Sequence, residues 1–172
     1  MNRQTIFFIA AVLVQTLILA AVPARRVYTL STGRSVVLKV APVDPYNVLS
    51  GYYVTLGYEI SRPESFPNAT RPQTWAMIYA VVEKGSDGIW HPVSLEKTLP
   101  QNLPPDRAVL RGRMEGWRIV YGIEEFYIPE TKRTAIADDL NKHSNAARVE
   151  VKVDAQGGAA LERLLIEDRV YE

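Results

Sequence analysis

The residues best suited to acid–base chemistry lie in one stretch, "YGIEEFYIPE", which runs from Tyr121 to Glu130. A carboxylate in apolar surroundings can serve as a general acid or base, but burying it ionised is costly without a partner. Glu124 and Glu125 would point to opposite faces of a strand, so at most one of them faces inward. The stretch then meets a proline, which predicts an element boundary. The candidate polar site consists of Glu124, Tyr127 and Glu130.

A structural role for Glu124 competes with this chemical one, and we prefer it. An inward glutamate would be held in an ion pair, and the arginines within reach in the sequence are Arg111, Arg113 and Arg118. Glu130 would then occupy the first turn of a following helix, where an acidic residue suits the helix dipole. We therefore assign no catalytic residue.

The sequence gives weaker signals for a metal site and for a phosphate-binding loop. The two histidines, His91 and His143, have no histidine or cysteine beside them, so we expect no metal site. The glycine pairs in "GSDG" and "QGG" lie between predicted strands rather than before helices, so they are not phosphate loops. We expect no cofactor.

The N-terminus predicts a membrane segment. Residues 6–22 are apolar except for one glutamine and one threonine, which is close to the lower length limit of a membrane span. We take residues 1–24 as an anchor or signal segment, and both readings stay open because "VPA" at 22–24 resembles a cleavage site. Residues 25–172 then form a single β-rich domain on the extracytoplasmic side of a bacterial cytoplasmic membrane.

Charge argues against a nucleic-acid partner. Without Arg3, the remainder of the chain carries 19 basic and 19 acidic residues, so its net charge is near zero. A neutral domain without a basic cluster gives no electrostatic footprint for nucleic acid.

The segments after the anchor are short, rich in β-branched residues and divided by turn signals. They predict a mostly β fold, an antiparallel β-sandwich or partly open barrel of about eight strands with one short helix. The helix is expected at Pro129–Ser144, because proline is favoured at the first helical position. The expected strands cover 35–41, 51–60, 75–84, 89–96, 108–115, 117–128, 147–153 and 159–166.

Three landmarks recur at a nearly constant spacing. Tyr53 and Tyr121 are 68 residues apart, while Tyr58 to Tyr127 and the turn glycines Gly88 to Gly157 are each 69 apart. The spacing suggests an internal duplication of about 70 residues. Two unrelated β-meanders with similar turns are the alternative.

The stretch "GYYVTLGY" at 51–58 shows the two-residue period of a strand. Val54, Leu56 and Tyr58 share one apolar face, which predicts that they are buried, whereas Thr55 and Glu59 lie on the opposite face. Its tyrosines are therefore packing residues rather than a reactive site.

The same stretch carries a resemblance to the bacterial GDYxxLxY family, and the match extends to "GRSVVLKVAPVDP", "LRGR" and "YGIEEFYIPE" in the expected order. The resemblance implies a membrane-anchored envelope protein without an assigned activity, and a mainly structural motif. The family's aspartate is replaced by Tyr52, which counts against chemistry at that carboxylate. The motif residues here are Gly51, Tyr52, Tyr53, Leu56 and Tyr58.

Together these observations predict an accessory or binding module of the cell envelope. It would meet the membrane through its N-terminal segment and would act with a membrane-protein partner. The alternative is a hydrolase that cleaves an envelope polymer through a carboxylate such as Glu124.

Overall fold

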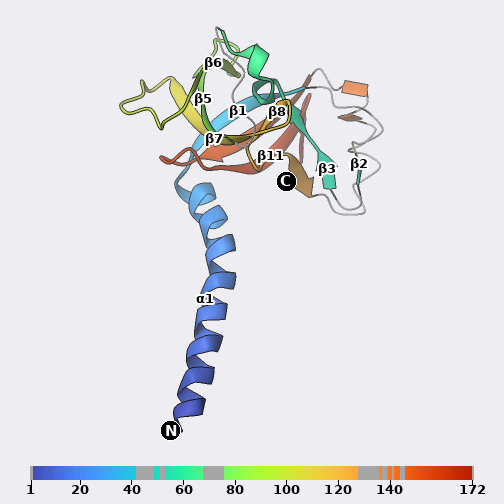
Figure 1. Ribbon diagram of the computed structural model, residues 1–172. Coiled ribbons are helices and arrows are strands. Elements are labelled where there is room, and N and C mark those ends of the chain that lie inside the picture. Colours follow the sequence, from blue (N-terminus) through green and yellow to red (C-terminus); the bar gives the residue numbers. More distant parts are fainter. Residues whose placement is uncertain are drawn as a thin grey trace.

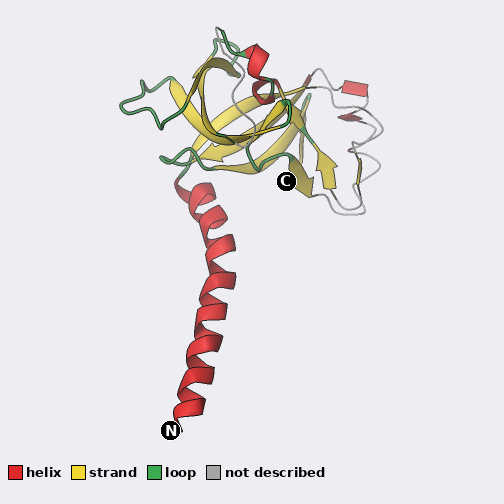
Figure 2. Ribbon diagram, viewed as in Figure 1, coloured by secondary structure: helices red, strands yellow, loops and turns green. Residues whose placement is uncertain are grey.

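The computed structural model describes residues 2–41, 49–50, 53–67, 76–127, 136, 139–140, 142–143 and 146–171. A single long helix projects from a β-rich domain (Figure 1). The strands form a curled antiparallel sheet that makes a half-barrel (Figure 2), so the predicted mostly β, partly open barrel is confirmed.

Helix α1 (Arg3–Thr32) is 30 residues long, and it continues through Pro23 past the predicted end of the segment at residue 24. Its most apolar 18-residue window has a mean hydropathy of 2.5, and none of that window is buried against the domain. The helix is therefore long enough to cross a membrane, and its apolar surface is not covered by the domain.

The end of α1 is fixed to the domain. The Gly33 N–H donates to the Thr29 carbonyl at 2.8 Å, and the Thr29 hydroxyl donates to Asp154 Oδ2 at 2.8 Å. Thr29 is only 3% exposed, although most of α1 is open to solvent. The junction between helix and domain is therefore an ordered contact.

The first sheet has the strand order β12-β11-β10-β1-β4, and every pair in it is antiparallel. Its alternating buried positions follow the β-branched pattern of the sequence, as expected for a sheet with one face on the core. The strands are β1 (Arg34–Ala41), β4 (Gly57–Tyr58), β10 (Ala147–Val153), β11 (Ala159–Ile166) and β12 (Arg169–Tyr171).

The second sheet has the order β6-β5-β7-β8, again antiparallel throughout. Its members are β5 (Met77–Lys84), β6 (Trp90–Glu96), β7 (Arg107–Glu115) and β8 (Arg118–Val120). A third, small sheet has the order β2-β3-β9, with β2 (Leu49–Ser50), β3 (Tyr53–Thr55) and β9 (Glu125–Tyr127).

Two expected strands are interrupted. The stretch 51–60 divides into β3 and β4, which belong to different sheets, and then enters the 3-10 turns η2 (Glu59–Ser61) and η3 (Pro63–Ser65). The stretch 117–128 divides into β8 and β9 around Gly122, whose φ is +80°. A positive φ of this size breaks a strand and is readily adopted only by glycine.

Two further elements concern the C-terminal part of the chain: strand β12 and the predicted helix. Strand β12 was not expected from the sequence. The predicted helix at 129–144 falls mostly outside the described residues, but residues 136, 139–140 and 142–143 are helical. Ile136 is 0% exposed and Leu140 is 6% exposed, so this segment contributes to the core.

The two large sheets repeat one another in strand order. In each, a two-stranded hairpin pairs through its first strand with a strand from the other half of the chain, so β6-β5-β7-β8 corresponds to β11-β10-β1-β4. The hairpin registers match residue for residue at a spacing of 69: Tyr79 pairs with Glu96, and Arg148 pairs with Leu165. Even the bulge recurs, after Val81 and after Glu150.

The turn landmarks are confirmed, and the tyrosine landmarks are wrong. Gly88 and Gly157 hold equivalent turns, with φ values of +78° and +77°. The pair β1–β4, in which Val40 pairs with Tyr58, corresponds to the pair β7–β8. In the register of β7 and β8, the residue at the place of Tyr58 is Tyr121 and not Tyr127. The error arose because the spacing is not constant along the chain. Common ancestry of the halves stays a prediction.

Candidate functional site

The predicted strand parity is confirmed at the motif. Val54, Leu56 and Tyr58 are at most 1% exposed, whereas Thr55 and Glu59 are half-buried. Tyr53 lies on the other face of β3, where its ring is 5.9 Å from that of Tyr127 on β9. Gly51 and Tyr52 lie outside the described residues.

The motif tyrosine Tyr58 belongs to a reciprocal pair of hydrogen bonds. Its hydroxyl donates to the Ile123 carbonyl at 2.5 Å, and the hydroxyl of its counterpart Tyr121 donates to the Ile60 carbonyl at 2.6 Å. Each tyrosine thus satisfies a carbonyl two residues beyond the other. The two bonds tie the segment after β4 to the segment after β8.

Burial raises the pKa of both tyrosine hydroxyls well above the ordinary value of 10.0, and the negative charge of Glu124 raises both further. Both hydroxyls therefore stay protonated at neutral pH, as their donor role requires. A tyrosine with a raised pKa is a poor nucleophile or base near pH 7.

Glu124 is buried, and backbone groups take up its carboxylate. Oε1 accepts the Tyr121 N–H at 2.6 Å, and Oε2 accepts the Gly122 N–H at 2.8 Å. The expected partner was an arginine, but no ion pair to Glu124 is found among the described residues. The turn at Gly122 brings two N–H groups within reach of one carboxylate, which the strand reading of 117–128 could not anticipate.

Of the sequence-predicted polar residues, the two that the structure describes, Glu124 and Tyr127, do not converge. Glu124 is 9% exposed and faces inward, Tyr127 is 60% exposed on the surface, and Glu130 lies outside the described residues. Glu125 is exposed, in agreement with the opposite-face argument. Backbone N–H groups bind both oxygens of Glu124, which favours a structural role for this carboxylate.

The histidines form no metal centre in the described part of the chain. His91 Nε2 lies 3.3 Å from Asp87 Oδ1, and His143 Nδ1 lies 2.8 Å from Glu167 Oε1, each a two-residue surface contact. No group of three metal-binding side chains is found among the described residues.

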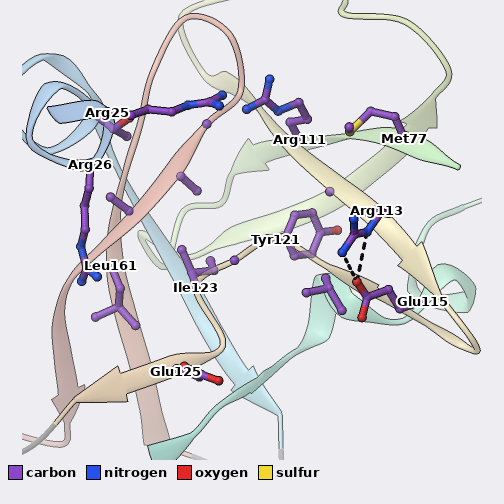
Figure 3. A pocket seen from close by; sticks show the side chains of 17 residues that line it. Arg25, Arg26, Met77, Arg111, Arg113, Glu115, Tyr121, Ile123, Glu125 and Leu161 are labelled. Atoms are coloured by element: carbon purple, nitrogen blue, oxygen red, sulfur yellow. Dashed lines mark hydrogen bonds and ion pairs between the residues drawn. The ribbon is translucent and has the colours of Figure 1, made fainter. Parts of the chain in front are cut away.

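A cavity of about 450 Å³ lies where α1 meets the domain, between β7, β8 and β11. Figure 3 shows Arg25 of α1 and Arg111 of β7 at one end of the cavity, with Tyr121 and Ile123 between the strands and Arg113 beside Glu115. Arg113 pairs with Glu115 at 2.6 Å. Four arginines line this cavity: Arg25, Arg26, Arg111 and Arg113.

Sequence reasoning missed this cavity. It considered Arg111 and Arg113 only as partners for Glu124, and it assigned no role to Arg25 and Arg26. A usable signal was present in "QGGAAL", where three small residues follow the turn glycine and leave room between strands.

A family model described as GDYXXLXY protein matches residues 15–164. The chain belongs to the GDYXXLXY family. The match covers most of the chain, and of the described motif residues in this GDYXXLXY protein, Leu56 and Tyr58 are core residues and Tyr53 is half-buried. No curated protein and no solved structure shows significant similarity to it.

Proposed function

We propose that this GDYXXLXY protein is a membrane-anchored accessory or binding module of the bacterial cell envelope, with its β domain on the extracytoplasmic side. The observation that carries the proposal is helix α1, which is long, apolar on all sides and not buried against its own domain. Such a surface is stable only in lipid or against other apolar surfaces.

Retention of the helix as an anchor is supported by its continuity. Residues 22–24, which resemble a cleavage site, lie inside α1, and the helix continues without a break to Thr32. The contact between Thr29 and Asp154 then holds the domain close to the end of the span.

The hydrogen-bond partners of the polar side chains favour a binding role over a catalytic one. The buried tyrosines and Glu124 use their hydrogen bonds within the fold, whereas Arg25 and Arg111 line an open cavity. A membrane-protein partner remains part of the proposal, because α1 offers an uncovered helix surface within the bilayer.

The proposal is tested by expressing the full chain with a reporter joined after Glu172. A reporter that is active only outside the cytoplasm should work, and the protein should stay with membranes after an alkaline carbonate wash. A matched variant with Leu13→Arg and Ile18→Arg should be released, because charges at the centre of a span are costly. Co-purification from solubilised membranes identifies the partner.

Two outcomes would contradict the proposal. Cytoplasmic reporter activity would reverse the side of the domain. A mature mass lacking residues 1–24 would replace the anchored protein with a secreted one.

A further inference from the structure

The arginine-lined cavity lies close to the predicted membrane surface. Arg25 and Arg26 follow the apolar run at 6–22 almost directly, and both line the cavity together with residues of β7, β8 and β11. Any ligand in the cavity would therefore sit at the level where lipid headgroups begin.

The charge of the cavity is unbalanced. Two carboxylates, Glu115 and Glu125, line it beside four guanidinium groups, and Glu115 is bound to Arg113 by hydrogen bonds of 2.6 and 3.1 Å. Figure 3 shows the side chains of Arg25 and Arg111 pointing toward one another, with Glu125 at the far end of the cavity. Like charges that face each other repel, and an anion bound between them would relieve this repulsion.

The two equivalent hairpins differ at this cavity. At the hairpin spacing of 69, Gly158 and Ala159 correspond to Ile89 and Trp90 of the first hairpin. Trp90 is 3% exposed and belongs to the core, whereas Ala159 lines the cavity. A glycine and an alanine thus stand where the other half has a large side chain.

The arginines also belong to one half only. The equivalence of β1 and β7, which the registers set at a spacing of 72, matches Arg113 to Ala41 and Arg111 to Lys39. The space of the cavity is therefore lacking at the equivalent position, where Lys39 keeps the positive charge of Arg111 but Ala41 does not keep that of Arg113.

We propose that this cavity binds a phosphate group, and that the group belongs to the headgroup of an anionic glycerophospholipid. Guanidinium groups bind phosphate oxygens in paired, charge-assisted hydrogen bonds, and two arginines on opposite walls can hold one group between them. The apolar lining of Met77, Ile123 and Leu161 suits the first methylene groups of the acyl chains of such a lipid. The inference rests on the membrane anchorage proposed above.

The test uses the purified full-length protein in a neutral detergent and follows its thermal unfolding. Three probes are added separately: a short-chain phosphatidylglycerol, the matching phosphatidylcholine and inorganic phosphate. A ligand that binds only the folded state raises the unfolding temperature with its concentration. We expect stabilisation by phosphatidylglycerol, and much less by phosphatidylcholine.

Three variants distinguish the cavity from the rest of the surface. Arg111→Gln should weaken the apparent affinity for phosphatidylglycerol about tenfold or more, since it removes one charge-assisted partner. Arg148→Gln is the matched control: it removes the same charge from an exposed position of β10 and should change nothing. Ala159→Trp copies the first hairpin, and should abolish binding while every arginine remains.

Each outcome decides the matter. Stabilisation by phosphatidylglycerol that Arg111→Gln weakens supports the proposal, even where Ala159→Trp fails to fold. An equal, Arg111-dependent effect of inorganic phosphate upholds the phosphate site and overturns the lipid assignment. If neither phosphatidylglycerol nor inorganic phosphate stabilises the protein, or if the stabilisation is unchanged in Arg111→Gln, the proposed site is overturned.

Failure of this inference can be told apart from failure of the anchorage. The Arg111→Gln protein should still pellet with membranes, because its apolar span is intact. Lack of lipid binding in detergent would leave the anchorage standing, and release of the protein from membranes would count against the anchorage alone.

Discussion

The hairpins β5–β6 and β10–β11 have the same register, the same bulge and the same turn, yet they differ in what surrounds them. Gly85 and Asp154 occupy the same turn position, and each donates its N–H to a carbonyl four residues later, at 2.8 and 2.9 Å. Hairpin β5–β6 ends in a sheet edge at β6, whereas β11 is bordered by β12 and contacts α1. Features common to both hairpins serve the fold, and features found at one alone are where a function can be sought.

The buried tyrosine pair extends the comparison to the partner strands. The reciprocal bonds of Tyr58 and Tyr121 obey the repeat, but the residue three positions on does not. Glu124 caps two backbone N–H groups, while its counterpart Ser61 is buried with a hydroxyl that has no hydrogen-bond partner among the described residues. The second half is therefore the more tightly held of the two at this point.

The largest expected effect tests whether the two halves are equivalent in the core. Leu38 and Leu110 occupy matching positions in β1 and β7 and are 1% and 0% exposed. Leu38→Ala and Leu110→Ala should each lower the free energy of unfolding by about 2–5 kcal/mol, through lost burial and a residual cavity. Urea denaturation of the domain measures both, and a harmless substitution at one site would break the equivalence.

A smaller loss is expected at Glu124, which only the second half possesses. Glu124→Gln replaces one carboxylate oxygen by an amide that cannot accept the second N–H, and should cost about 1–3 kcal/mol. The exposed neighbour Glu125→Gln should change stability by less than about 0.5 kcal/mol. Thermal unfolding compares the two. A Glu124→Gln protein of full stability that loses its cellular role would point to a functional site instead.

The tyrosine pair should respond symmetrically to mutation and to alkali. Tyr58→Phe and Tyr121→Phe should each cost about 1 kcal/mol, the net value of one hydrogen bond. Both pKa values are raised by burial and by Glu124, so their contribution to stability is constant below the ordinary pKa of 10.0 and falls as the pH rises beyond it. Urea denaturation at pH 8 and above pH 10 (about pH 10.5) should show a shallower decline in the double phenylalanine variant. An equal decline would assign the alkaline loss to other groups.

The smallest effect is expected at the helix junction, which is also unique to the second hairpin. Thr29→Val removes the bond to Asp154 Oδ2, but Asp154 Oδ1 keeps the N–H groups of Gln156 and Gly158 at 2.9 and 2.8 Å. The domain should lose less than about 1 kcal/mol, since the turn stays intact. Scanning calorimetry would show a loss well above this if the junction supported the whole sheet.

Local patterns predicted the fold well wherever neighbours in sequence are neighbours in space. Turn chemistry at "GSDG" and "QGG" placed both hairpins, and the two-residue period placed Leu56 and Tyr58 inside. The same reasoning predicted β3 and β4 as one strand and β8 and β9 as another, because a change of sheet does not alter the alternation of side chains. Only a positive φ at Gly122 marks one of these breaks.

The candidate cavity could not be found in this way, because its walls come from distant parts of the chain. Arg25 and Arg111 meet only after α1, β7 and β11 have assembled. The partner of Glu124 was also out of reach, since two backbone N–H groups replace the expected arginine. Comparison of the repeats, with "GGAA" set against "GIWH", was the available clue.

The exchange of strands between the two halves has a consequence for how the protein must come into being. Strand β1 directly follows helix α1 and is synthesised first, yet its main partner is β10, and Arg34 pairs with Val153 across most of the chain. Closing a loop of this length must precede the contacts that reward it, which makes such folds slow to form. Neither half can complete a sheet while the other is still being synthesised. Until the last hairpin has been synthesised, β1 has an unpaired edge beside helix α1, at the stage when a nascent chain is most exposed to aggregation and proteolysis.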